Sequence, residues 1–63
     1  MDYYADVTKL LTDAGCYRVA IVRPGVEGWE SPRTGPFLVD NPIRSQANAN
    51  NILRNAGLAP VFQ

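Results

Sequence analysis

Residues 17–39 read YRVAIVRPGVEGWESPRTGPFLV, and this stretch decides the fold. Its first six residues, 17–22, are rich in aromatic and β-branched side chains, which favour an extended backbone. Alternation along a regular strand places Tyr17, Val19 and Ile21 on one face. We therefore predict a first strand here, with Val19 and Ile21 in the core.

Two turns divide the rest of this stretch into two more strands. Pro24-Gly25 favours a turn, and the proline and glycine of residues 31–35 (SPRTG) favour a hairpin loop. Strands are expected at Val26–Ser31 and around Phe37–Val39. Two successive hairpins predict a three-stranded antiparallel meander.

Amphipathic helices are predicted on both sides of this meander. The first covers residues 2–14, with Asp2 as the expected N-cap and Gly15 at its end. Ser45 is expected to cap a second helix that ends at Gly57. The apolar stripes at helical spacing are Tyr3, Val7, Leu10, Leu11 and Ala14 in the first helix, and Ala49, Ile52, Leu53 and Ala56 in the second.

These elements predict one α+β domain over residues 1–63, in the order α-β-β-β-α. Both helices are expected to cover one face of the sheet and to leave the other to water or a partner. The expected core consists of Val7, Leu10, Leu11, Val19, Ile21, Trp29, Phe37, Val39, Ile52 and Leu53. A chain this short buries only about 60% of its unfolded surface, so we expect a partner or self-association to add stability.

Composition narrows the possible functions. Six basic residues balance six acidic ones, which argues against strong attraction to nucleic acid over the whole surface. The chain contains no histidine, and Cys16 is its single cysteine, so we expect no zinc site, no internal disulfide and no cofactor. Cys16 is predicted to be a small buried residue. The first residues do not match a signal peptide, and no apolar stretch approaches the roughly 20 residues of a membrane span. A cytoplasmic location with no membrane association is therefore expected.

Two segments resemble the HicA-like toxin family. Residues 25–35 (GVEGWESPRTG) are similar to a segment in which a Ser-His or Asp-His pair precedes an aromatic residue and a Ser-Pro-x-Thr-Gly turn. Residues 43–58 (IRSQANANNILRNAGL) resemble the family's Ile-Lys-Ser followed by a Thr-Ala-Asn-x-Ile-Leu-Lys-x-Ala-Gly-Leu helix. The resemblance covers nearly the whole chain, and the joint order of the motifs is more specific than any one of them.

The resemblance implies a double-stranded-RNA-binding-like fold and a bacterial toxin that cleaves mRNA without a metal ion and is neutralised by a HicB-like antitoxin. In that family the catalytic residue is a histidine at the start of the second strand, and the matching position here is Val26. Histidine suits this task because its pKa near neutrality lets it accept and return a proton. Valine can do neither, so we assign no catalytic residue and expect impaired cleavage.

Three arginines are the candidate RNA-binding residues. Arg23, Arg33 and Arg44 lie at predicted strand ends and loops, where guanidinium groups reach phosphates. Trp29 has two interpretations, a base-stacking residue or the main side chain of a small core, and we favour the core.

Three functions remain open. The first is a HicA-like RNA-binding protein that is catalytically impaired. The second is a ribonuclease that uses a different residue, for which Glu27 is the nearest candidate; alternation points Glu27 away from Val26, and we expect it to face solvent. The third is a non-enzymatic interaction module that binds a protein partner or itself. The tyrosines have ordinary pKa values near 10 and are poor bases at neutral pH.

Overall fold

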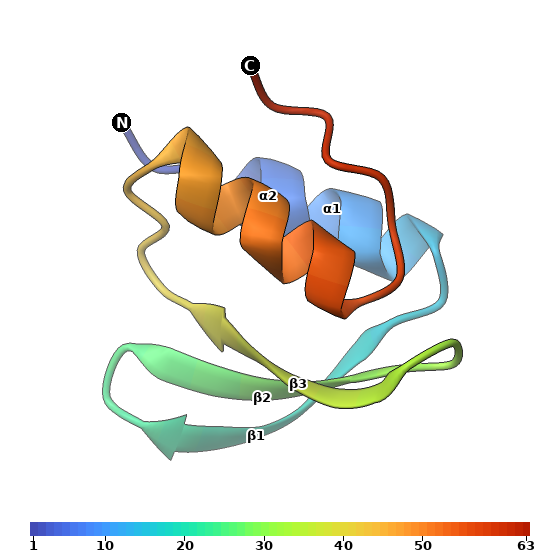
Figure 1. The fold of residues 1–63 in the computed structure, drawn as a ribbon. Coiled ribbons are helices and arrows are strands. Elements are labelled where there is room, and N and C mark those ends of the chain that lie inside the picture. Colours follow the sequence, from blue (N-terminus) through green and yellow to red (C-terminus); the bar gives the residue numbers. More distant parts are fainter.

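Two helices flank three strands along the chain in the computed structural model, which describes residues 1–63 (Figure 1). The elements are α1 (Tyr4–Asp13), β1 (Tyr17–Arg23), β2 (Val26–Ser31), β3 (Gly35–Asp40) and α2 (Gln46–Asn55). The predicted α+β class and element order are confirmed. Neither helix has the length and apolar character needed to cross a bilayer.

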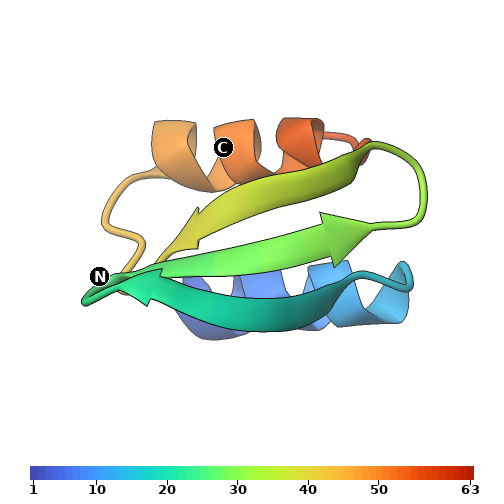
Figure 2. The same ribbon diagram turned by 90° about the horizontal axis from the view of Figure 1, so that it is seen from below.

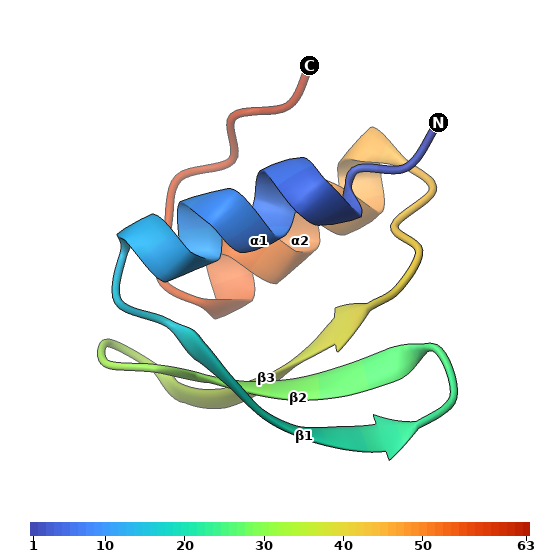
Figure 3. The same ribbon diagram turned by 180° about the vertical axis from the view of Figure 1, so that it is seen from behind.

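The three strands form one antiparallel sheet in which β2 lies between β1 and β3. Both helices lie on the same face of this sheet, α1 on the side of β1 and α2 on the side of β3 (Figures 2 and 3). The predicted two-layer arrangement is therefore confirmed. We call the two sides of the sheet the helix face and the open face.

Both helices end in the way that the sequence predicts. Gly15 has a φ of 90°, a left-handed conformation that favours glycine, and the amide of Cys16 donates to the carbonyl of Leu11 at 2.9 Å. An equivalent hydrogen bond ends α2, where the amide of Leu58 donates to the carbonyl of Leu53 at 2.8 Å. Both termini are Schellman motifs encoded by an Ala-Gly pair.

The helix starts match the prediction only in α2. The Ser45 hydroxyl accepts the amide of Asn48 at 3.0 Å, as expected of an N-cap. Asp2, in contrast, lies one residue outside the cap position of α1. Its carboxylate accepts the amides of Tyr4 and Ile43, both at 2.9 Å. Asp2 therefore joins the start of α1 to the segment that precedes α2.

Eleven apolar residues form the core between the sheet and the helices. They are Val7, Leu11, Cys16, Trp29, Phe37, Val39, Ile43, Ala49, Ile52, Leu53 and Ala56. Three residues that are predicted in the core are instead exposed. The exposed fraction of the residue is 36% for Leu10, 61% for Val19 and 67% for Ile21. Ile43, which was not predicted, is completely buried.

The register of β1, which contains two of these three residues, is irregular. Arg18 pairs with Trp29 and Ala20 pairs with Gly28, so one extra residue, Val19, lies between two consecutive pairs. A second shift of the same kind occurs at Val22, between Ile21 and Arg23. Each extra residue resets the alternation of side chains, as β-bulges do.

The prediction that Tyr17, Val19 and Ile21 share one face is therefore wrong for Ile21, and the face that Tyr17 and Val19 share is the open face, not the core face. Tyr17 pairs with Glu30 on the open face, whereas Ile21 pairs with Glu27, which points to the helix face. Ile21 still stays exposed, because the C-terminal part of β1 lies far from the helices (Figures 1 and 3).

Candidate nucleic-acid interface

One end of the sheet brings together the β1–β2 turn and the segment between β3 and α2. The amide of Asn41 donates to the carbonyl of Gly25 at 2.9 Å, which holds the two segments side by side. We call this region, residues 23–26 and 40–45, the turn end. The Asn41–Pro42 peptide bond within it is cis.

Val26 lies at the turn end as the first residue of β2. It pairs with Arg23 of β1 and with Asp40 of β3, and its side chain is half-buried. Cross-strand partners share a face, so Val26 and Arg23 both belong to the open face. A histidine at this position would project beside an arginine.

The three candidate arginines do not form one cluster. Arg23 and Arg44 are both exposed and both belong to the turn end. Arg33 lies at the opposite end of the sheet, in the β2–β3 loop, where its guanidinium donates to the carbonyl of Gly57 at 3.1 Å. Arg33 therefore contacts the end of α2, and a single ligand at the turn end meets two of the three arginines.

Acidic groups at the turn end offset these two arginines. Hydrogen bonds from the amides of Ile43 and Tyr4, together with the charge of Arg44, hold the pKa of Asp2 below its ordinary value. Asp40 accepts a hydrogen bond from the side chain of Asn48 at 2.7 Å. The turn end thus carries charges of both signs.

Glu27 is buried on the helix face with only 4% of its area exposed, so our expectation that it faces solvent is wrong. The Tyr4 hydroxyl donates to its carboxylate, with 2.8 and 2.9 Å to the two oxygens, and the Trp29 indole N–H donates at 2.9 Å. Asn41 donates at 3.4 Å, and the Arg18 guanidinium lies 3.7 Å away. We call these five residues the Glu27 cluster.

The cluster keeps Glu27 ionised. Burial raises the pKa of its carboxyl, but hydrogen bonds from Trp29, Tyr4 and Asn41 and the charge of Arg18 outweigh that effect and leave the pKa below its ordinary value. The pKa of Tyr4 is raised, first by burial and then by the hydrogen bond to the Glu27 carboxylate. Every buried polar side-chain atom has a hydrogen-bond partner.

The geometry separates Glu27 from the position of the family's histidine. Glu27 points to the helix face and Val26 to the open face, so the two side chains lie on opposite sides of β2. The interpretation of Trp29 as a core residue is confirmed, because only 6% of its area is exposed. Its indole closes the Glu27 cluster and presents little surface for stacking on a base.

One feature of the sequence indicates that the Glu27 carboxylate is buried. Trp29 was predicted in the core, and alternation places residue 27 on the same face of the strand. The partners contributed by Tyr4 and Asn41 come from distant parts of the chain and left no local pattern.

The chain contains no group of three or more His, Cys, Asp or Glu side chains arranged to hold a metal ion.

Comparisons with protein-family models, with curated proteins and with solved structures find no match for this chain.

Proposed function

We propose that this chain is a HicA-like RNA-binding domain with little or no ribonuclease activity. The proposal rests on the two segments that resemble the family, residues 25–35 and 43–58. The α-β-β-β-α order with both helices on one face agrees with the fold that this resemblance implies.

The residue at the start of β2 is the basis for the catalytic part of the proposal. Val26 stands where the family has its histidine, and it shares the open face with Arg23. Two carboxylates flank this position: Glu27 is buried on the other face, where it accepts hydrogen bonds from Tyr4 and Trp29, and Asp40, opposite Val26 on β3, accepts one from Asn48. No histidine lies beside Val26, because the chain contains none, and loss of a general base lowers a rate by about 10²- to 10⁴-fold.

Arg23 and Arg44 support weak, sequence-tolerant binding of RNA at the turn end. Both guanidinium groups are exposed, and no salt bridge within the chain occupies either. Each phosphate contact with a single strand adds about 0.7 to the slope of log K against log salt. Two contacts predict a shallow slope of roughly 1.4.

Cleavage of RNA by the purified protein tests the catalytic part. We expect no cleavage by the unmodified chain, and some cleavage by Val26→His because the new imidazole would project beside Arg23. Val26→Asn is the matched control, since it adds polarity without a base. Robust cleavage by the unmodified chain that persists after stringent removal of contaminating nucleases would contradict the proposal.

Fluorescence anisotropy with a labelled single-stranded RNA tests the binding part. Arg23→Ala and Arg44→Ala should each weaken binding and lower the salt slope by about 0.7. Arg54→Ala is the control, because Arg54 lies on α2 and its guanidinium donates to Asn51. Equal effects of all three substitutions, or binding that does not respond to salt, would argue against a site at the turn end.

A non-enzymatic protein-interaction module is the second candidate, and the open face favours it. This face carries exposed aliphatic side chains from β1 and β3. A HicB-like antitoxin is the protein partner that the resemblance implies.

A further inference from the structure

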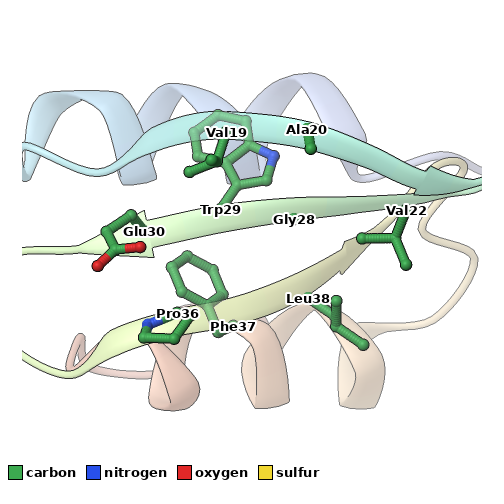
Figure 4. A pocket seen from close by; sticks show the side chains of 9 residues that line it. All are labelled: Val19, Ala20, Val22, Gly28, Trp29, Glu30, Pro36, Phe37 and Leu38. Carbon is green, nitrogen blue, oxygen red and sulfur yellow. The ribbon is translucent and has the colours of Figure 1, made fainter.

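The open face of the sheet is apolar and hollowed. A depression of about 360 Å³ lies over the middle of the three strands (Figure 4). Its lining residues are Val19, Ala20, Val22, Gly28, Trp29, Glu30, Pro36, Phe37 and Leu38. Leu38 is 49% exposed, and Val19 and Val22 are exposed to a greater extent. Contiguous exposed apolar patches on soluble proteins mark sites of contact with a partner.

The two register shifts in β1 enlarge this apolar surface. Val19, Ala20 and Val22 all line the depression. Regular alternation from Tyr17, which lies on the open face, would have turned Ala20 and Val22 toward the helix face. Bulges that re-aim side chains in this way are structural features with a purpose more often than defects.

Gly28 forms the floor of the depression at the centre of β2. A Cβ atom at this position would lie 3.3 Å from a methyl carbon of Val22, so a larger residue would crowd the side chain that borders the hollow. The absence of a side chain leaves space between Val22 and Leu38, which lie on the two neighbouring strands (Figure 4).

The charges on the open face are divided between its two ends. Arg23, opposite Val26, lies at the turn end of β1, and Glu30, opposite Tyr17, lies at the other end of β2. The Asp40 carboxylate is already bonded to Asn48 of α2. A rotation that reverses the strand direction therefore places Arg23 of one copy over Glu30 of the other.

We propose that the open face binds a second copy of this chain in a two-fold symmetric, face-to-face dimer. The two-fold axis lies in the interface, perpendicular to the strands, so β1 covers the partner's β1 in the opposite direction. Val19, Val22 and Leu38 of each copy fill the hollow of the other. The partner's Arg23 lies beside Tyr17 and Glu30, where it makes a cation–π contact and an ion pair.

The chemistry of the face fits this occupant, and its size indicates a weak dimer. The molecule measures 26 × 25 × 15 Å, and its short dimension runs across the three strands (Figures 1 and 2). The face is therefore smaller than the roughly 800 Å² per partner of a standard interface, and interfaces below the standard size belong to weak complexes. Sheets pack face to face through such interdigitating aliphatic side chains. RNA is a poorer fit, because Tyr17 is the one exposed aromatic side chain on this face.

Pairing through the free edge of β1 is a less favourable way to join two copies. The two extra residues in β1 distort the ladder of backbone groups that a new strand would need. The same residues add methyl groups to the open face, so the irregularity that weakens the edge strengthens the face.

Sedimentation equilibrium from about 5 to about 500 µM protein tests the dimer, a range suited to an interface of this size. We expect a monomer–dimer equilibrium that Leu38→Lys shifts to monomer throughout the range. Val61→Lys is the control, because Val61 is exposed to a similar extent on the C-terminal segment, away from the open face. Circular dichroism verifies that each variant is folded. A strictly monomeric unmodified chain would overturn the proposal.

A charge exchange tests the arrangement of the two copies. Arg23→Glu and Glu30→Arg should each raise the dissociation constant by roughly tenfold, because a symmetric interface contains every substitution twice. The double variant should return it to near the original value. Two single variants without effect, or a double variant no better than either, would overturn this orientation. These measurements contain no RNA, and neither Glu30 nor Leu38 belongs to the turn end, so their outcome is separate from the RNA tests even though Arg23 is also a candidate RNA contact.

Discussion

The two faces of the sheet contrast in an unexpected way. On the helix face an ionised carboxylate, Glu27, is buried, while on the open face apolar side chains such as Leu38 meet water. The buried carboxylate is tolerated because Tyr4, Trp29 and Asn41 donate hydrogen bonds in place of the lost water. The apolar side chains stay exposed because an antiparallel sheet tolerates one uncovered side. Burial in this protein therefore follows the surroundings of a residue more closely than its polarity.

The largest effect is expected when the buried member of a matched pair of glutamates is removed. Glu27→Ala should lower the free energy of unfolding by about 3 kcal/mol, because it leaves the Trp29 N–H and the Tyr4 hydroxyl without their acceptor. Glu30→Ala, on the open face of the same strand, should change it by less than about 0.5 kcal/mol. Urea unfolding followed by Trp29 fluorescence measures both. Equal losses would remove the contrast between the faces.

Two neighbouring residues of β3 provide the corresponding test with apolar side chains. Val39 is completely buried, and Val39→Ala should lower the free energy of unfolding by about 2 kcal/mol. Leu38→Ala removes a larger side chain from the open face and should cost less than about 0.5 kcal/mol at protein concentrations where the chain is monomeric. A greater loss at Leu38 than at Val39 would show that the open face is covered within the monomer.

The pH dependence of stability should report the Glu27 cluster. The folded-state pKa of Glu27 lies below its ordinary value, so its contribution is present above the ordinary carboxyl pKa of about 4.3 and is lost as the pH falls through the folded-state pKa. The raised pKa of Tyr4 acts at the other extreme: its contribution is present below about pH 10 and is lost as the pH rises through the folded-state value.

Urea midpoints measured across this pH range check both directions. Glu27→Gln should flatten the acid side only in part, because the pKa of Asp2 is also lowered. Tyr4→Phe should flatten the alkaline side. Stability of the unmodified chain that rises on acidification would contradict the assignment.

The smallest effect is expected at Ile21, where sequence and structure disagree. Regular alternation predicts a core residue, whereas the structure leaves this side chain mostly exposed. Ile21→Thr should therefore change the free energy of unfolding by less than about 0.5 kcal/mol. A loss near 2 kcal/mol, typical of a core substitution, would show that the helices cover Ile21 and contradict its exposed position near the end of β1.

Local chemistry made most of the fold predictable. The turn at Pro24-Gly25 and the helix ends at Gly15 and Gly57 depend on backbone conformations that a few adjacent residues favour. Ser45 caps α2 through a bond to an amide three residues away. Such interactions span one turn of chain, so the sequence alone determined the order of the elements and the C-terminal ends of both helices. It also determined that position 26 carries no proton-accepting group.

Only the tertiary structure decided which residues meet across the sheet. The register shifts at Val19 and Val22 depend on how β1 pairs with β2, and they set which side chains reach the open face. The burial of Glu27 depends on Tyr4, 23 residues away, and the separation of Arg33 from the other two arginines depends on where the strands end. Such contacts join segments that are distant in sequence, and alternation or spacing within one segment carries no information about them.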